Sequence, residues 1–274
     1  MKKIFNLRGK NLELGGKTLI MGVMNVTPDS FSDGGRYSSD DVAMAHAAQM
    51  IEYGADILDI GAESTRPGAT PITADEEFSR LEKILPAIKN LGATISIDTY
   101  KPEVAAQALE LGADMINDVH GLEDSRMIDV AKKFDVPVIA MHSEKCGEGD
   151  IISDVKKFFR RTLANCAFKN FDTTKIIFDP GIGFGKTPEE DLEILRRLDE
   201  LKTLDGQEIF LMIGASRKSF IGRATGFKLD ERDEATGAVC VHAITKGVDI
   251  VRVHNVKMIS RMCLVADLLR RKNS

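Results

Sequence analysis

Three polar side chains stand where short apolar runs of the chain end: Asp98, Asn117 and Asp179. Carboxylates and an amide gathered at one place can bind a flat heterocycle that is rich in N–H donors. A guanidine-like edge suits a carboxylate especially well, because two parallel N–H donors meet two acceptor oxygens. The three residues therefore predict a pocket for a pyrimidine-like ring.

Each of these residues also has a purely structural interpretation. Asp98 precedes a Thr and a helix-starting Pro, so its side chain could cap that helix. Asn117 and Asp118 could bond their own backbone in a turn, and Asp179 precedes Pro180 and could simply end its strand. Convergence of three separate strands on one rim favours the binding interpretation.

Positive charge follows two later apolar runs, in Ser216–Ser219 and Arg252–His254. Isolated basic loops are usually solvated surface, but Arg252 ends an apolar strand, where an unpaired charge would be costly. Because barrels commonly hold phosphate after their last two strands, these residues predict a site for an anionic leaving group.

Two further motifs are weaker. The glycine-rich run Gly181–Thr187 fits neither the Walker spacing nor the dinucleotide-binding spacing, so a flexible turn that brings Phe184 and backbone N–H groups near a ligand is expected. His142 could suggest zinc, but without a second ligand cluster an ordinary loop is favoured. The long polar loops Asn25–Ser39 and Glu63–Thr73 are expected to close over a ligand.

The elements that must position these residues alternate between strand and helix, as in βαβ units with a parallel sheet. The predicted strands are Leu19–Asn25, Ile57–Gly61, Thr94–Asp98, Met115–Asp118, Pro137–Met141, Lys175–Asp179, Ile209–Gly214 and Ile250–Val253. The predicted helices are Ser39–Tyr53, Thr73–Leu91, Pro102–Leu111, Arg126–Phe134, Ser153–Phe171, Pro188–Leu201, Asp233–Lys246 and Lys257–Arg271.

This alternation favours one domain over residues 1–274, an α/β fold of the (βα)8 or TIM-barrel class with parallel strands. The alternative is an open doubly wound sheet, but that fold normally has a Gly-rich phosphate turn after its first strand, and here the turn reads Asn25-Val26-Thr27-Pro28-Asp29. In a closed barrel the active site lies at the C-terminal rim of the strands, where the polar residues above would meet.

Composition excludes several classes of protein. Of the 274 residues, 43% are hydrophobic and 29% are charged, a balance that supports a folded core rather than disorder. The net charge of -5 argues against nucleic acid and membrane partners, although a local basic patch can still bind a small anion.

The cysteines and the N-terminus point to a cytoplasmic protein. The 4 cysteines are widely spaced without a C-x-x-C pair, which fits a reducing compartment. Met1 to Phe5 begins like a signal peptide, but Asn6, Arg8 and Lys10 interrupt any apolar segment. No run reaches the roughly 18 apolar residues of a membrane span.

Several motifs in order resemble those of one family. They are Asn25–Gly35, Gly61–Gly68, Ser96–Thr99, Ile116–Val119, Asp179–Phe184, Ser216–Ser219 and Arg252–His254. Together they resemble the dihydropteroate synthases over almost the whole chain. The resemblance implies a TIM-barrel enzyme of folate biosynthesis that joins 6-hydroxymethyl-7,8-dihydropterin diphosphate to p-aminobenzoate and releases pyrophosphate with the help of Mg2+.

The resemblance also implies roles for individual residues. Asp98, Asn117, Asp179 and Lys218 would hold the pterin, and Met141 and Gly214 would complete the substrate-binding set. Asn25 would help to bind the metal and the diphosphate, with Arg66, Arg252 and His254 on anionic oxygens. Thr65, Pro67, Phe31, Phe184 and Ser219 would frame the aminobenzoate, and Asp98, Lys218, Arg252 and His254 would act in catalysis.

Some positions depart from the family pattern. His120 stands where a small residue is usual, Asn255 follows His254 where Asp is common, and the loop after Met141-His142 lacks the usual Gly/Pro-containing sequence. Two other functions stay open: a pterin-dependent methyltransferase domain, which needs no pyrophosphate cradle, and a noncatalytic pterin-binding barrel. The resemblance further suggests a homodimer through barrel helices.

Overall fold

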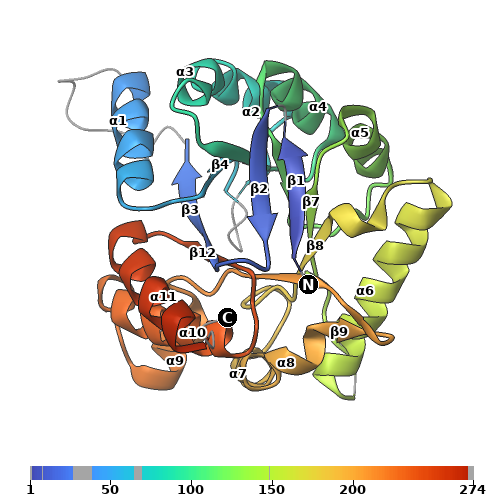
Figure 1. Ribbon diagram of the computed structural model, residues 1–274, viewed down its shortest axis with the longest axis vertical. Coiled ribbons are helices and arrows are strands. Elements are labelled where there is room, and N and C mark those ends of the chain that lie inside the picture. The colour runs from blue at the N-terminus through green and yellow to red at the C-terminus, as the bar shows by residue number, and fades with distance from the viewer. Residues whose placement is uncertain (1, 8, 27–38, 65–69, 148, 271–274) are drawn as a thin grey trace.

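Eight parallel strands close into a barrel that a ring of helices surrounds (Figure 1). The computed structural model describes residues 2–7, 9–26, 39–64, 70–147 and 149–270. Neighbours around the barrel follow the order β11-β12-β3-β4-β5-β6-β7-β8, so the ring closes between β8 and β11. The predicted TIM-barrel fold is confirmed.

All the predicted strands are present. They are β3 (Leu19–Asn25), β4 (Ile57–Gly61), β5 (Thr94–Asp98), β6 (Met115–Asp118), β7 (Val138–Met141), β8 (Ile176–Asp179), β11 (Phe210–Ile213) and β12 (Ile250–Val253). Three strands start one residue later than predicted, and β11 also ends one residue earlier. The agreement is close because strands that are buried on both faces read as continuous apolar runs.

The helices agree less closely. They are α1 (Ser39–Glu52), α2 (Ala74–Leu81), α3 (Leu85–Lys89), α4 (Pro102–Leu111), α5 (Arg126–Phe134), α6 (Ile151–Phe168), α7 (Pro188–Arg196), α8 (Leu198–Leu201), α9 (Ser219–Thr225), α10 (Asp233–Thr245) and α11 (Val256–Arg270). The predicted helix Thr73–Leu91 is two helices, because Pro86 lies in the first turn of α3, where its missing N–H and its ring prevent a continuous helix.

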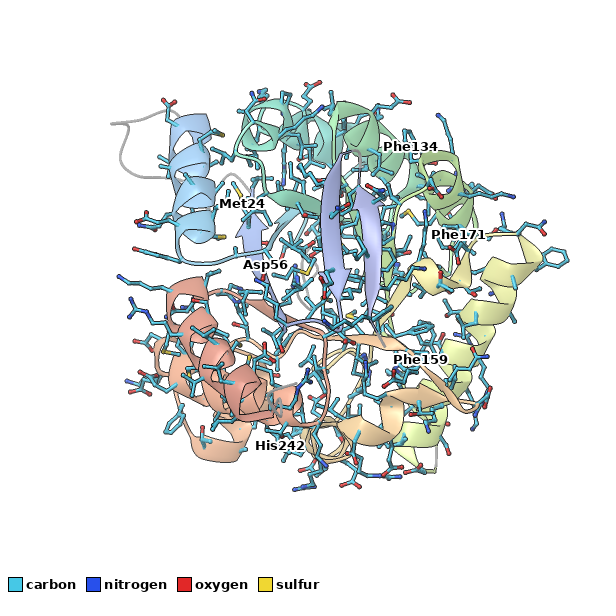
Figure 2. All side chains as sticks on the ribbon, viewed as in Figure 1. Met24, Asp56, Phe134, Phe159, Phe171 and His242 are labelled. Carbon is cyan, nitrogen blue, oxygen red and sulfur yellow. The ribbon has the colours of Figure 1, made fainter. Side chains whose placement is uncertain are left out.

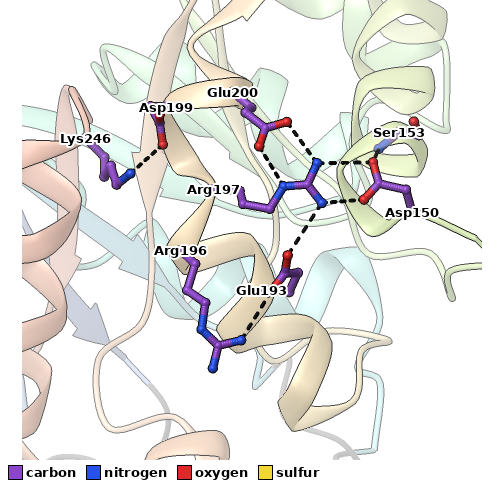
Figure 3. Close-up of polar contacts among 8 residues, drawn as sticks. All are labelled: Asp150, Ser153, Glu193, Arg196, Arg197, Asp199, Glu200 and Lys246. Atoms are coloured by element: carbon purple, nitrogen blue, oxygen red, sulfur yellow. Dashed lines mark hydrogen bonds and ion pairs between the residues drawn. The ribbon is translucent and has the colours of Figure 1, made fainter.

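The predicted helix Pro188–Leu201 is also divided, at Arg197 (Figure 3). The Arg197 guanidinium donates to Asp150, the N-cap residue of α6, at 2.5 Å, and to Glu200 Oε1 at 2.6 Å. Lys246, which caps α10, donates to Asp199 of α8 at 2.7 Å. The helix thus breaks where its residues contact neighbouring helices. The periodicity of the sequence does not show such contacts.

An antiparallel hairpin that was not predicted lies at the N-terminal end of the barrel. Its strands are β1 (Lys3–Leu7) and β2 (Lys10–Leu14). Phe5, Leu7, Leu12 and Leu14 are buried in one cluster with the first inward residues of the barrel strands. The hairpin crosses that end of the barrel in Figure 1 and closes it. A smaller hairpin, β9 (Thr203–Leu204) with β10 (Gln207–Glu208), and the short helix α9 were also not predicted.

A second apolar layer lies between the barrel and its helices. On α6, the ring of Phe159, labelled in Figure 2, stacks on Phe178 of β8 with centroids 4.2 Å apart. Along each strand, residues that face the helices alternate with residues that face the interior of the barrel. Packing of the helix-facing residues therefore fixes the strands that carry the interior side chains. Within the described ranges, no helix combines the length and the apolar character needed to cross a bilayer.

Candidate active site

A layer of polar residues lies directly above the apolar floor of the barrel. The floor includes Ile57, Met115, Ile177 and Ile250, which all belong to the cluster with the N-terminal hairpin. Because side chains alternate along a strand, the residue two positions later faces the same interior. Those residues are Asp59, Asn117, Asp179 and Arg252, while Asp98 occupies the corresponding end of β5.

Arg252 joins two buried carboxylates. Its Nε donates to Asp59 Oδ2 at 2.6 Å, and its Nη2 donates to Asp98 Oδ2 at 2.6 Å. Asn117 Nδ2 also donates to Asp59 Oδ2, at 3.0 Å. The charge of Arg252 is therefore partnered within the chain by two carboxylates, and the anion predicted for it stays a prediction. Asp59 was not among the predicted site residues.

Three acceptor oxygens of this group have no hydrogen-bond partner among the described residues. They are Oδ1 of Asp59, Oδ1 of Asp98 and Oδ1 of Asn117, all buried. Buried acceptors of this kind are costly unless a ligand or water satisfies them. The arrangement is thus suited to a flat ligand that presents several N–H donors.

Burial raises the pKa of two carboxylates in this layer, those of Asp98 and Asp179. It raises the pKa of Asp98 from 3.8 to about 7, against the opposing effect of Arg252 and with further upward contributions from Asp59 and Glu77. Burial likewise raises the pKa of Asp179, which the Gly181 amide and Lys218 oppose. A ligand that brings N–H donors would favour the charged forms of both groups.

The structural alternatives hold for some residues and not for others. Asp98 caps no helix, since the N-cap residue of α4 is Lys101 and this helix has no side-chain cap hydrogen bond. Asp118 does serve a turn, because its carboxylate accepts from the backbone N–H of His120 at 2.8 Å and of Leu122 at 3.0 Å. Asp179 also serves a turn, because its Oδ1 accepts from Gly181 N at 2.7 Å, while it belongs to the polar layer as well.

Lys218 stands at the N-terminus of α9, on the rim beside β8. Its Nζ lies 3.8 Å from the ring centroid of Phe184. Burial lowers the pKa of Lys218 to about 8, with Arg252 lowering it further and Asp179 opposing. A Cβ on Gly183 would stand 3.1 Å from Lys218 Cδ, so glycine leaves room for this lysine. Ser219, the first residue of α9, is exposed beside it.

The predicted anion loops contain two separate polar groups. His254 Nδ1 lies 2.9 Å from Ser216 Oγ, which links the ends of β11 and β12. Arg217 instead pairs with Asp233, with Nε to Oδ1 at 2.6 Å. Asn255 also donates to Asp233, at 2.9 Å, which accounts for an amide at this position. Arg217 is therefore a structural residue in this conformation.

Two remaining substrate-binding predictions fall on the barrel wall. Met141 is buried at the end of β7, two residues after the inward-facing Ile139. A Cβ on Gly214 would stand 3.6 Å from Asp179 Oδ2 and 3.9 Å from Arg252 Cβ, so this glycine lies between the two charged residues. Met141 and Gly214 both lie beside the polar layer, where they can form part of the wall of the site.

Some predictions fall on residues that the structure does not describe. Phe31, Thr65, Arg66 and Pro67 lie outside the described residues. Asn25, the predicted metal ligand, ends β3 at the C-terminal rim. No group of three or more His, Cys, Asp or Glu suited to a metal ion occurs in the part of the chain that the structure describes.

A polar network beside the site was missed in the sequence. Lys101 Nζ donates to Glu63 and to Glu77 Oε2, the latter at 2.6 Å, and Tyr100 Oη donates to Glu63 Oε1 at 3.0 Å. The atypical His120 stacks on Tyr100, with ring centroids 4.2 Å apart. These contacts join the ends of β4, β5 and β6.

The glycine-rich run after β8 differs from the expected flexible turn. Gly181 N donates to Asp179 and Gly183 N donates to Asp191, both at 2.7 Å, so these amides are already bonded. His142 packs edge-on against Phe158, with centroids 5.3 Å apart, and burial lowers its pKa to about 3. A neutral, enclosed imidazole agrees with a structural role for His142.

Comparison with known proteins agrees with this geometry. The family described as "Pterin binding enzyme" matches residues 21–254. A dihydropteroate synthase of Bacillus subtilis is 44% identical over 259 residues, covering 93% of this chain and 90% of the relative. The structure of Xanthomonas albilineans dihydropteroate synthase with 4-aminobenzoic acid is similar, with TM-score 0.93 and 33% identity over 100% of both chains.

The same Xanthomonas enzyme in complex with 7,8-dihydropteroate is also similar, with TM-score 0.90 and 31% identity, covering 99% of this chain and 100% of that one. The match spans the barrel from its first strand to the rim residue His254. This chain therefore belongs to the pterin-binding enzymes and, within them, to the dihydropteroate synthase family.

Proposed function

We propose that this chain joins 6-hydroxymethyl-7,8-dihydropterin diphosphate to p-aminobenzoate, forming 7,8-dihydropteroate and pyrophosphate. The observation that carries this proposal is the set of buried, unpartnered acceptor oxygens on Asp59, Asp98 and Asn117 above a closed apolar floor. The pyrimidine part of a pterin presents N–H donors along one edge and is flat enough to lie between strands that converge.

The pterin would occupy the polar layer. Asp98, Asn117 and Asp179 would supply acceptors, and Lys218 would supply an ammonium donor from the rim beside Asp179. Asp59 would serve in two ways, because its Oδ2 holds both Asn117 and Arg252 while its unpartnered Oδ1 would add a further acceptor. Such support fixes the orientation of groups that touch the ligand.

The reaction would be a substitution at the pterin methylene. The bond between that carbon and the diphosphate oxygen breaks, its electron pair leaves with pyrophosphate, and positive charge develops on the pterin. The amine nitrogen then forms the new bond and loses a proton. A fixed carboxylate such as Asp98 stabilises the developing positive charge, and holding the neutral amine in line supplies much of the remaining rate.

The departing diphosphate needs positive groups. We assign Arg252 and His254 to its oxygens, together with Arg66. His254 lies at the end of β12, and its ring nitrogen contacts Ser216. Arg252 retains further N–H donors beyond the two bonded to carboxylates, because a guanidinium has five. Both residues stand on the rim that also carries Lys218.

Asn25 would help to hold Mg2+. A single amide oxygen with no cluster of carboxylates among the described residues suits a magnesium ion that is bound mainly by substrate phosphates. When bound, the ion would neutralise negative charge on the diphosphate.

Phe184, Ser219, Thr65, Pro67 and Phe31 would frame the aminobenzoate. Phe184 and Ser219 lie near Lys218, at the open end of the site. Sulfonamides are expected to compete with p-aminobenzoate because they mimic its shape, and an inhibition pattern that is not competitive would reject this assignment.

Release of pyrophosphate tests the proposed reaction. The purified chain is given the dihydropterin diphosphate with and without p-aminobenzoate at controlled Mg2+, and dihydropteroate is detected separately. Release that requires both substrates is expected. Tight pterin binding without turnover, under conditions in which a reference synthase is active, would instead indicate a binding barrel.

The proposal extends to assembly and location. Leu264, Val265, Leu268 and Leu269 are exposed and share one face of α11, which suits a homodimer because large exposed apolar faces usually mark contacts. All the cysteines are free thiols, in accord with a cytoplasmic location. Residues 1–274 would act as one domain.

A further inference from the structure

The ammonium group of Lys186 bridges two loops at the rim. Its Nζ donates to His142 O at 3.0 Å, in the loop after β7, and to Gly181 O at 3.1 Å and Phe184 O at 3.0 Å, in the loop after β8. It forms no ion pair with any carboxylate of the described residues. Burial lowers the pKa of Lys186. A lysine that is desolvated in order to bond three carbonyls costs stability, so a positional role would explain it.

The same two loops pack backbone against backbone. A Cβ on Gly181 would stand 1.9 Å from His142 O, and a Cβ on Gly185 would stand 2.8 Å from Ser143 O. Both glycines have positive φ, at 72° and 62°. Only glycine combines this backbone conformation with so close an approach.

The loop is also held from its far side. Asp191, buried in the first turn of α7, accepts from Gly183 N at 2.7 Å. Phe184, between the two fixed glycines 183 and 185, is therefore anchored before and after its own position. Its ring meets Lys218 Nζ at 3.8 Å, which connects the loop to the rim after the neighbouring strand β11.

We propose that Lys186 is a positioning residue that fixes the loop after β8 so that Phe184 presents its ring to p-aminobenzoate. This inference rests on the proposed function, in which Phe184 frames that substrate. Lys186 itself touches neither substrate. Its three carbonyl contacts would set the ring position. Asp98 and Asn117 lie in strands that Lys186 does not contact, and Asp179 is held by the amide of Gly181.

The test variant is Lys186→Met, which keeps a side chain of similar length and removes the ammonium group. Lys145→Met is the matched control, because Lys145 is exposed in the neighbouring loop after β7. Steady-state rates give kcat and a separate KM for each substrate. We expect the KM for p-aminobenzoate to rise about 10- to 100-fold for Lys186→Met, as small misplacements of positioning groups do, while the KM for the pterin changes less than about threefold.

A double-mutant cycle with Phe184→Ala separates positioning from general damage. If Lys186 acts through Phe184, then Lys186→Met should add little to the rise in KM that Phe184→Ala already causes. Full additivity, or parallel changes in both KM values, would overturn the proposal. Should Lys186→Met fail to fold, Asp191→Ala releases the same loop from its other anchor and must raise the same KM.

The outcomes distinguish this inference from the proposed function. If the unchanged chain and Lys145→Met release no pyrophosphate, the proposed function fails. If they are active and Phe184→Ala leaves the KM for p-aminobenzoate unchanged, the role of Phe184 fails. If Phe184→Ala raises that KM and Lys186→Met does not, the positioning role of Lys186 alone is refuted.

Discussion

Replacing Asp98→Asn separates the catalytic value of this carboxylate from its effect on stability. The side chain is 8% exposed, with Oδ2 bonded to Arg252 at 2.6 Å and Oδ1 without a partner among the described residues. Asparagine keeps the shape and removes the charge. Loss of one fixed electrostatic contact to a transition state typically lowers kcat about 10²- to 10³-fold.

Stability should change in the opposite direction. The pKa of Asp98 is raised from 3.8 to about 7, so the folded chain binds this proton more tightly than the unfolded chain does. The free energy of unfolding therefore falls as pH rises from about 4 to about 7, by up to roughly 4 kcal/mol for this interval. The asparagine variant lacks this loss, and its stability relative to the unchanged chain should increase across the same window.

The assay combines pyrophosphate release with urea unfolding at pH 5, 7 and 8. Asp230→Asn, at an exposed aspartate, is the control for the loss of a carboxylate. A kcat for Asp98→Asn within about threefold of the unchanged chain would refute the electrostatic role. A stability difference that does not vary with pH would refute the argument from burial.

Three further predictions concern other parts of the chain. Because the pKa of Lys218 is lowered to about 8, kcat/KM for the pterin substrate should fall above that pH. Lys218→Arg should remove this fall at alkaline pH. If the variant shows the same fall, a group other than Lys218 causes it. Phe5→Ala should lower the free energy of unfolding by about 3–5 kcal/mol, because Phe5 packs on Phe210 in the floor of the barrel. The kcat of the folded fraction should be unchanged. A changed kcat in fully folded protein would contradict this prediction. Leu268→Glu should shift sedimentation from dimer to monomer, and an unchanged mass would exclude the α11 face as the interface.

The barrel could be predicted because its signals are local. Continuous apolar strands and intervening helices define the repeats, and the polar residues at strand ends point to the rim. The prediction missed Asp59 because it considered only residues at the C-terminal ends of strands and in the loops that follow them. Asp59 lies inside Ile57–Gly61, and a charged residue within such a run is itself a signal of an interior partner.

Other features depend on contacts between distant segments. The β1–β2 hairpin does alternate apolar and polar residues, and its buried residues are Phe5, Leu7, Leu12 and Leu14. This pattern alone does not show that the hairpin covers the open end of a barrel. The pairing of Lys186 with three carbonyls has no sequence signature, because backbone oxygens are present at every position.

The hairpin also determines the route that substrates must take. Phe5 and its neighbours fill the N-terminal end of the barrel, so among the described residues access to the interior is left at the C-terminal rim. In the proposed function the pterin would lie in the deep polar layer, while Phe184 and Lys218 lie closer to the open end. An occupant of the open end would obstruct access to that layer. If the chain acts as proposed, the pterin substrate would therefore bind before p-aminobenzoate, and the joined product would leave through the same opening.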